Sequence, residues 1–408
     1  MTNHYIDLKN SDVILIMGSN AAEHHPLAFK WIMRAKDAGA RVIHVDPRYT
    51  RTSARCDYHV PLRSGTDIAF LGGMINYIIT NKKYFRDYVV NYTNASFLVN
   101  PDFSFKDGLF SGYDAKKRSY NKETWTFQND ANGVPLKDPT LEHPQCVFQH
   151  LKRHYSRYTL EKVSSITGVS EENLLKVYEE YSATGAPDKA GTECYALGWT
   201  HHTTGSQIIR TMSIIQLLLG NMGIAGGGIN ALRGEPNVQG STDHCILYGN
   251  LPGYLKMPTA SLATLGQYLK KNTPTCNDPQ SANYYQNYPN FFVSWLKSLY
   301  GNAATPENEF GYSWLPKLND GKHYSQLHLF DRMYKGGVKG LFAYGTDPAV
   351  SSPNTNKVRK ALEKLDWLVC ANIFDNETAS FWFGPGADPK QIKTEVFLLP
   401  AAATMEKE

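Results

Sequence analysis

The hydrophobic pattern near the N-terminus predicts a strand, a helix and a second strand. Residues 11–17 form a mostly apolar run, which is typical of a strand buried on both faces of a parallel sheet. Residues 18–20 break that run, and Pro26 opens a helical stretch that continues through Lys36. Residues 40–45 form a second apolar run, which stops at an Asp-Pro pair. The pattern therefore predicts a βαβ unit.

Residues 340–371 repeat this layout, with an apolar run, a glycine break, a proline before a helical stretch and a returning apolar run. In a gap-free alignment at an offset of 327 residues, Gly18 meets Gly345, Pro26 meets Pro353 and Val42 meets Val369. We interpret this as a pseudo-repeat, although α/β units in general share such features. If the repeat is real, each half should hold a similar part of a ligand at the carboxyl ends of its strands.

The segments between these units predict an α/β fold with two domains. Residues 67–92, 160–182 and 206–219 have helical patterns, with two short helices expected in the second of these ranges. Residues of about 100–145 are polar, aromatic and rich in turn formers, so we expect a surface insertion. We place one domain at 1–235 and a second, incomplete one at 236–400, with an irregular excursion over about 251–325.

Length and composition exclude several classes of protein. A chain of 408 residues is too long for one ordinary core, and a net charge of +4 does not point to nucleic acid. The most apolar run, Met212–Leu219, is shorter than the ~20 residues of a membrane-spanning helix. The six cysteines contain no C-x-x-C pair, so an iron–sulfur cluster or zinc site built by this chain alone is not expected.

The loop that starts at Gly18 is the first candidate for ligand binding. A glycine after a buried strand lets backbone N–H groups approach a ligand, and the following helix start favours an anion such as a pyrophosphate. The sequence fits neither the dinucleotide fingerprint nor the P-loop. A plain strand-to-helix turn is the alternative.

The segment after the second predicted strand combines a carboxylate with many cations. Asp46 ends the strand, where it could bind a pair of ribose hydroxyls, and Asp67 could accept hydrogen bonds from a guanine edge. Five arginines follow or flank it and suit phosphate through their planar donors: Arg41, Arg48, Arg51, Arg55 and Arg63. The alternative is a solvated charged surface.

Two further loops carry candidate chemistry. His201 and His202 lie in a loop after Gly198, where they could bind a metal or line a ligand site, although no third metal ligand is nearby. Residues 220–240 contain many glycines, which suggests backbone packed tightly against something. Arg233 lies among small and amide residues in this block and fits an anion clamp, or is a surface charge of a structural loop. The partial dinucleotide fingerprint at 226–231 is rejected, because it follows a helix rather than a strand.

Taken together, these motifs resemble the catalytic subunit of the respiratory and periplasmic formate dehydrogenases, in the molybdopterin oxidoreductase superfamily. The resemblance covers the whole chain, and its most specific part is the ALRG-x-x-N-x-Q-G block. The matching segments are GSNAAEHHP, VDPRYTRTSARCDYHVPLRSGTDIAF, YALGWTHHTTGSQIIRTM, NMGIAGGGINALRGEPNVQGSTD and YGTDPAVSSPNTNKV. It implies two Rossmann-like α/β domains of the dimethyl sulfoxide reductase type, with a long insertion.

The resemblance also implies cofactors and the residues that contact them. The family binds molybdenum or tungsten through two molybdopterin guanine dinucleotides, in agreement with the two pseudo-repeated units. By resemblance, one guanine dinucleotide contacts Gly18, Asn20, Glu23, Asp46, Arg48, Gly65, Thr66 and Asp67. The surroundings of the pterin or of the second nucleotide are expected to include Gly198, His201, Gly345, Asp347 and Asn354.

Arg233 matches the family arginine that binds the formate carboxylate. A bidentate guanidinium can hold both oxygens and aim the C–H bond at the metal site. The resemblance thus implies formate oxidation, with electrons leaving to an iron–sulfur β subunit and a cytochrome b or c subunit in the periplasm. The rival hypotheses are a nitrate or polysulfide reductase, a nucleotide-binding or assembly protein, and a nonfunctional remnant.

Parts of the family pattern are not found in this sequence. The family begins with a four-cysteine segment for a [4Fe–4S] cluster, has a selenocysteine or cysteine metal ligand just before the segment that matches Met1, and ends with a further domain. We therefore expect the chain to be an internal piece of the subunit that is inactive alone. Restart of a gene reading after a selenocysteine codon would explain its start.

Overall fold

The computed structural model describes residues 2–106, 108–234 and 238–407, and the chain divides into two compact units. The first unit comprises Met1–Val238 with Thr275–Asn283, and the second comprises Gln239–Pro274 with Tyr284–Glu408. Both units are α/β structures with parallel sheets, as the sequence predicts. In the described part of the chain, no helix is long and apolar enough to cross a membrane.

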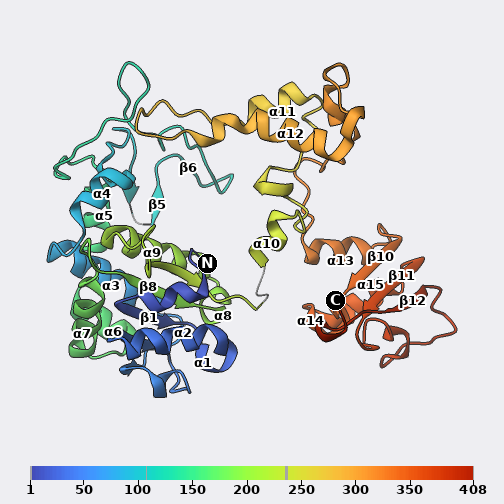
Figure 1. Ribbon diagram of the computed structural model, residues 1–408, viewed down its shortest axis with the longest axis horizontal. Helices are drawn as coiled ribbons and strands as arrows, with labels where there is room; N and C mark the ends of the chain where they lie inside the picture. The colour runs from blue at the N-terminus through green and yellow to red at the C-terminus, as the bar shows by residue number, and fades with distance from the viewer. Residues whose placement is uncertain (1, 107, 235–237, 408) are drawn as a thin grey trace. The chain divides into compact units, whose positions relative to one another are not determined.

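The first unit is built on a parallel sheet of five strands in the order β3-β2-β1-β8-β9. Figure 1 labels two neighbouring strands of this sheet, β1 and β8. The strands are β1 (Val13–Met17), β2 (Arg41–Val45), β3 (Tyr58–Val60), β8 (Gly191–Tyr195) and β9 (Gly228–Ala231). All five residues of β1 are buried, as the continuous apolar run predicts for a central strand. Because β2 and β8 lie on opposite sides of β1, the strand order reverses between β1 and β8.

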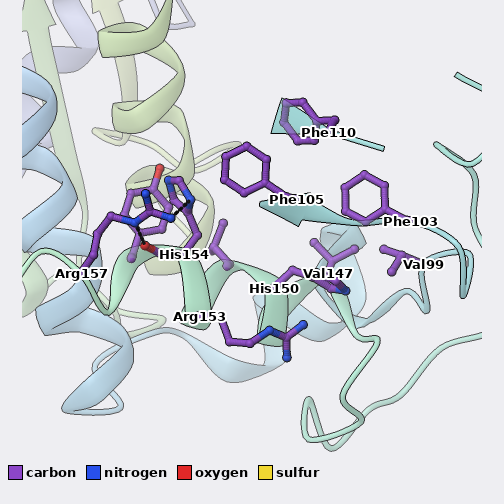
Figure 2. A pocket seen from close by; sticks show the side chains of 11 residues that line it. Val99, Phe103, Phe105, Phe110, Val147, His150, Arg153, His154 and Arg157 are labelled. Carbon is purple, nitrogen blue, oxygen red and sulfur yellow. Dashed lines mark hydrogen bonds between the residues drawn. The ribbon is translucent and has the colours of Figure 1, made fainter. Parts of the chain in front are cut away.

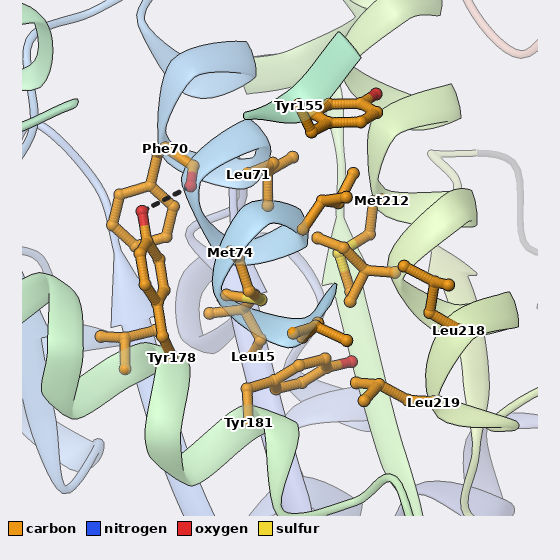
Figure 3. Packing of buried hydrophobic residues seen from close by; sticks show 14 of the residues in the cluster. Leu15, Phe70, Leu71, Met74, Tyr155, Tyr178, Tyr181, Met212, Leu218 and Leu219 are labelled. Carbon is orange, nitrogen blue, oxygen red and sulfur yellow. Dashed lines mark hydrogen bonds between the residues drawn. The ribbon is translucent and has the colours of Figure 1, made fainter. Parts of the chain in front are cut away.

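Two hydrophobic cores cover the two faces of this sheet. Ile14 and Ile16 pack with α2 (Pro26–Asp37) on one face. Leu15 and Met17 face a larger core, part of which Figure 3 shows, formed with α3 (Asp67–Thr80), α7 (Glu171–Ser182) and α9 (Gly205–Leu219). In that core the hydroxyl of Tyr178 donates a 2.7 Å hydrogen bond to the carbonyl of Phe70. The sheet is therefore covered on both faces.

The remaining elements of the first unit lie between β3 and β8 or flank the strand ends. The helices are α1 (Ala21–His24), α4 (Arg86–Tyr92), α5 (Val147–Tyr155), α6 (Leu160–Thr167) and α8 (Leu197–Thr200). The predicted insertion contains two antiparallel hairpins, formed by β4 (Phe105–Lys106) with β5 (Leu109–Phe110) and by β6 (Tyr113–Asp114) with β7 (Ser119–Tyr120). The single helical stretch expected over residues 67–92 is two helices, because Lys82 between them has a φ of 53°.

The second unit contains a parallel sheet of three strands, β10 (Gly340–Tyr344), β11 (Trp367–Asn372) and β12 (Glu395–Pro400). Its helices are α11 (Leu265–Asn272), α12 (Tyr288–Tyr300), α13 (Gln326–Tyr334), α14 (Pro348–Ser351) and α15 (Thr355–Leu362), and α10 (Val238–Asp243) begins at the unit boundary. The prediction of an irregular excursion over about 251–325 was wrong for α11 and α12, which share a buried cluster of their own. Its Pro-, Asn- and Tyr-rich composition concealed the helical spacing of Tyr288, Phe292 and Leu296, all buried.

The two units share their first elements at the predicted offset. Strand β10 and helix α14 have the bounds of β1 and α1 shifted by 327 residues, which supports the pseudo-repeat. The gap-free alignment is nevertheless one residue out at the return strand. Ile14 pairs with Val42, whereas Leu341, the equivalent of Ile14, pairs with Leu368 rather than Val369. The connection before the second strand is therefore one residue shorter in the second unit.

The glycine-rich block is packed against the start of the chain, and part of it is the strand β9. A Cβ atom at Gly226 would lie 2.3 Å from the carbonyl oxygen of Asn10, and one at Gly228 would lie 2.1 Å from Oγ1 of Thr2. The tight packing that the sequence predicts is thus present. It is made with residues of the same chain.

Candidate functional site

The candidate site lies where the loops that follow β1 and β8 meet. Gly18 has a φ of 71°, and a Cβ atom there would lie 2.6 Å from Cδ1 of Trp199. A Cβ atom at Gly198 would in turn lie 2.6 Å from the carbonyl oxygen of Gly18, which accepts a 3.0 Å hydrogen bond from the Gly198 N–H. Only glycines allow this close approach. The contact between the two loops lies at the carboxyl edge of a parallel sheet where the strand order reverses. Ligands usually bind at such a position.

Two adjoining cavities open at this edge, with volumes of about 610 and 490 Å³. They share Gly18, Asp46, Leu197 and Gly198 as lining residues. The larger cavity is also lined by the predicted residues Asn20 and Arg233, and the smaller one by Gly65, Asp67 and His201. Eight of the predicted site residues, which are scattered over 216 positions of the sequence, are therefore brought to one edge of the sheet.

A buried carboxylate and two stacked rings form the inner wall of this site. Oδ1 of Asp67 accepts a 3.1 Å hydrogen bond from the indole N–H of Trp199. Burial raises the pKa of Asp67, while its backbone hydrogen bond and the nearby His202 act in the opposite direction. The ring of Trp199 stacks on Tyr195 with a centroid distance of 5.1 Å. One carboxylate oxygen of Asp67 is thus held by Trp199, which itself packs on Tyr195.

Arg233 lies just beyond β9, where its backbone is held by a histidine from the other side of the cavity. The Nε2 atom of His25 lies 3.0 Å from the carbonyl oxygen of Arg233. Because a carbonyl can only accept, Nε2 must carry the proton in this hydrogen bond. Burial lowers the pKa of His25, and the bond to Arg233 partly offsets that effect. The guanidinium is exposed and forms no ion pair with any carboxylate that the structure describes.

Asp46 directly follows β2 and lies near a fully buried histidine. Oδ1 of Asp46 accepts a 2.8 Å hydrogen bond from the N–H of Arg48, and Oδ2 lies 3.8 Å from Nε2 of His44. Burial lowers the pKa of His44 to about 4, although the negative charge of Asp46 opposes the shift. Nδ1 of His44 is 2.8 Å from Oγ of Ser53. A neutral imidazole therefore supports the Asp46 turn at neutral pH.

The other predicted residues of the first unit lie around the crevice or next to it. Glu23 and Arg48 line a separate open hollow of about 560 Å³ together with Arg51, whose Nε lies 3.5 Å from Oε1 of Glu23. Asn20 links this hollow to the crevice, since its amide donates to the Glu23 carboxylate and its oxygen accepts a 2.8 Å hydrogen bond from Thr52. Thr66 does not line a described cavity, and its hydroxyl donates to the carbonyl of Arg63 at 2.6 Å.

Three predicted residues belong to the second unit, at the carboxyl edge of its own sheet. Gly345 follows β10 and is exposed, with a φ of 59°. Oδ1 of Asp347 accepts hydrogen bonds from the N–H (3.0 Å) and the hydroxyl (2.6 Å) of Thr378. Asn354 has a φ of 56° and caps α15, where its side chain accepts from the Lys357 N–H at 3.3 Å. Each of these side chains thus shapes the loop in which it lies.

Several lining residues were not predicted as site residues. The two cavities are also lined by His25, Tyr195, Leu232 and His202, and the indole of Trp199 packs closely against Gly18. Most lie within two residues of a predicted position, so their loops were identified but not their individual roles. The contact between Trp199 and Asp67 joins residues 132 positions apart, and no local pattern indicates it.

Comparison with known proteins identifies the family. A family model described as molybdopterin oxidoreductase matches residues 1–382. The chain belongs to the molybdopterin oxidoreductase family. This agrees with the resemblance found in the sequence and with the pair of parallel α/β sheets. The molybdopterin oxidoreductase family implies a molybdopterin cofactor that carries molybdenum or tungsten.

Curated relatives of this molybdopterin oxidoreductase chain are named as formate dehydrogenases. It is 62% identical to formate dehydrogenase 2 subunit alpha (cytochrome c-553) of Nitratidesulfovibrio vulgaris and 61% identical to formate dehydrogenase subunit alpha of Megalodesulfovibrio gigas. Identity is 50% with the nitrate-inducible formate dehydrogenase major subunit of Escherichia coli. These matches cover the whole chain, which spans about 40% of the length of each relative. Among solved structures, acetylene hydratase from Pelobacter acetylenicus matches 92% of this chain and 42% of its own, with a TM-score of 0.48 and 16% identity.

The residues at the crevice fit such a cofactor chemically. Each of the two cavities lies within the range of small-molecule and cofactor sites, about 300–1,000 Å³. Oγ of Ser19 lines the larger cavity, is buried and has no hydrogen-bond partner in the described structure, so it can serve a ligand. The carboxylates of Asp46 and Asp67 supply acceptors, and the arginines of the adjoining hollow supply donors for phosphate. The described residues contain no group of three side chains that could bind a metal ion.

Proposed function

We propose that the chain is part of the catalytic subunit of a formate dehydrogenase, which oxidises formate to carbon dioxide, a proton and two electrons. When bound, the molybdopterin centre would supply the redox chemistry, and the protein would bind and orient formate. The support comes from family membership, from relatives at 50–62% identity that are named as formate dehydrogenases, and from the position of Arg233.

Arg233 carries the proposal for substrate binding. Arg233 lines the larger cavity, and its guanidinium forms no ion pair with a carboxylate among the described residues, so it can bind an anion. Formate offers only two oxygens, and a planar guanidinium can bind both at once. The hydrogen bond between His25 and the Arg233 carbonyl fixes the backbone from which this side chain extends. We therefore assign formate binding to Arg233 and positioning of its backbone to His25.

We further propose that the cofactor is the guanine dinucleotide form, present twice. The first nucleotide would contact the residues that the sequence predicts in the first unit, from Gly18 through Asp67, with Asp67 accepting from the guanine edge. Gly198 and His201 would contact the adjoining pterin. The second nucleotide would contact Gly345, Asp347 and Asn354, because these occupy the equivalent edge of the pseudo-repeated sheet.

The experiment that tests substrate binding is a substitution of Arg233 in the polypeptide expressed from its native gene, with formate-dependent dye reduction as the assay. Arg233→Lys keeps the positive charge but loses bidentate geometry, so KM for formate should rise about 10- to 100-fold. Arg210→Lys on an exposed face of α9 is the matched control and should leave KM unchanged. An unaltered KM in Arg233→Lys would show that formate is bound elsewhere.

The electron path and the compartment are proposals that rest on relatives. One relative is named with cytochrome c-553, and this supports a cytochrome as an electron acceptor here. We propose an iron–sulfur β subunit as the intermediate partner, a [4Fe–4S] cluster in the polypeptide segment that precedes these residues, and a periplasmic location. Copurification of a β subunit, with iron–sulfur signals in electron paramagnetic resonance, tests the assembly.

A further inference from the structure

A separate cavity of about 430 Å³ lies in the insertion of the first unit, formed by residues 99–157. Figure 2 shows the rings of Phe103, Phe105 and Phe110 on one side of it and side chains of α5 on the other. None of its lining residues lines the crevice at the sheet edge. Its volume is within the range of small-molecule sites, about 300–1,000 Å³. This cavity is therefore separate from the proposed cofactor site.

The apolar wall of this cavity is a set of packed rings. Phe105 and Phe110 pair across the hairpin with a centroid distance of 4.6 Å, and Phe103 lies 6.1 Å from Phe110. Trp125 supports Phe110 from behind at 5.1 Å. Phe110 still has 39% of its surface exposed, so the wall is open to an incoming ligand. Such a surface favours a flat aromatic or aliphatic group.

The opposite wall carries positive charge from α5 and the residues that follow it. Arg153 donates to the carbonyl of Pro144 at 3.0 Å, and Arg157 donates to the carbonyl of His154 at 2.8 Å. These bonds anchor the two guanidiniums while leaving further N–H donors on each. Neither arginine forms an ion pair with a described carboxylate, and the described lining of the cavity contains no acidic residue. The cavity is thus complementary to an anion.

His150 adds a polar atom that lacks a partner. Its Nε2 is buried and makes no hydrogen bond in the described structure, although the ring belongs to the cavity wall. The rings of Phe103 and His150 form a T-shaped pair with a centroid distance of 5.5 Å. Buried polar atoms are normally hydrogen-bonded, so an unpaired one beside a cavity suggests that a ligand atom or water completes it.

We propose that this cavity binds a small amphiphilic carboxylate, with its apolar body against the phenylalanine rings and its carboxylate between Arg153 and Arg157. Three features support this: an apolar wall, two arginines without an ion-pair partner among the described residues, and a buried imidazole nitrogen without a hydrogen-bond partner in the described structure. Apolar contact or charge alone would give weak binding, and the pairing of the two walls gives selectivity for molecules that have both parts.

The probe for this proposal is 3-phenylpropionate, titrated into the full chain by isothermal calorimetry at physiological salt. The primary amide of the same acid has the same apolar body without charge, and propionate has the charge without the ring. The acid should show saturable binding to one site, about tenfold tighter than the amide, the effect of one lost charge-assisted interaction. Propionate should not saturate in the same range.

Substitutions locate the site. Arg153→Gln with Arg157→Gln should weaken the acid about tenfold and leave the amide unchanged. Lys152→Gln removes one charge from the same helix outside the cavity and should have no effect. If the double variant fails to fold, as judged by circular dichroism, Phe110→Glu is the substitute, because it places a carboxylate at an exposed position of the wall and should repel the acid. Equal affinity for acid and amide, no saturation, or an equal loss in Lys152→Gln would overturn the proposal.

Discussion

Glu193 is a buried carboxyl group whose protonation state can be tested through the pH dependence of stability. It lies at the centre of β8, between Leu15 and Ile229 on the neighbouring strands, and is fully buried. Neither of its carboxyl oxygens has a hydrogen-bond partner in the described structure. The nearby hydroxyl of Tyr181 donates to Gln216 instead, at 3.0 Å. Burial raises the pKa of Glu193 well above the ordinary value of 4.5. We therefore expect it to be protonated in the native protein.

The sign of the pH effect follows from proton binding. Between the ordinary pKa and the raised one, the folded state holds a proton that the unfolded state has lost, so stability falls as pH rises. The slope for one such group is about 1.4 kcal/mol per pH unit. From pH 5 to pH 7 the loss is about 2.7 kcal/mol if Glu193 stays protonated throughout. Replacement by methionine removes the titration and fills a similar volume.

The measurement is the free energy of unfolding by urea from pH 5 to pH 7 for wild type, Glu193→Met and Glu142→Gln. Relative to wild type, the methionine variant should gain about 2.7 kcal/mol of stability between pH 5 and pH 7, and it should be the more stable protein at pH 7. The control removes an exposed carboxylate and should follow the wild type. Parallel slopes for wild type and Glu193→Met would refute the assignment of a buried, protonated carboxyl.

Three other predictions use the same chain. Gly18→Ala should cost about 2–4 kcal/mol in urea unfolding, because its Cβ would overlap an indole, whereas Gly39→Ala, also at positive φ but with open space around it, should cost only about 1 kcal/mol. Relative to wild type, His44→Gln should gain stability as pH falls from 6.5 towards 4, by about 1.4 kcal/mol per unit, since the buried imidazole of wild type resists protonation; parallel pH dependences of the two proteins would contradict this. Asp67→Asn should weaken GMP binding in calorimetry about tenfold relative to Asp37→Asn, a substitution at the far end of α2, and unchanged binding would remove Asp67 from the nucleotide site.

The elements that carry their own local signal were the ones that the sequence predicted. The buried run of β1, the break at Gly18 and the carboxylate after β2 each follow from a few adjacent residues, and the structure has them where they were expected. Helix α12 was missed because prolines and asparagines surround an apolar face that recurs only every fourth residue.

The contacts that complete the site depend on residues far apart in the chain. His25 meets the backbone of Arg233 across 208 positions, and Trp199 meets Asp67 across 132. Such pairs are set by strand order, which the sequence alone left open. The proposed formate oxidation therefore rests on the resemblance and the family match. The cavity that Arg233 lines and the hydrogen bond from His25 to its backbone are visible only in the structure.

The order of strands in the first unit also constrains how the protein can be made. The partner of β1 on one side, β8, is synthesised roughly 180 residues after it. At a translation rate of about 5–20 residues per second, one edge of β1 waits on the order of 10–40 seconds on the ribosome before its neighbour emerges. During that interval the apolar β1–β2 pair has an open edge able to add a foreign strand. We expect nascent chains of this protein to need a holding chaperone until residue 195 has left the exit tunnel.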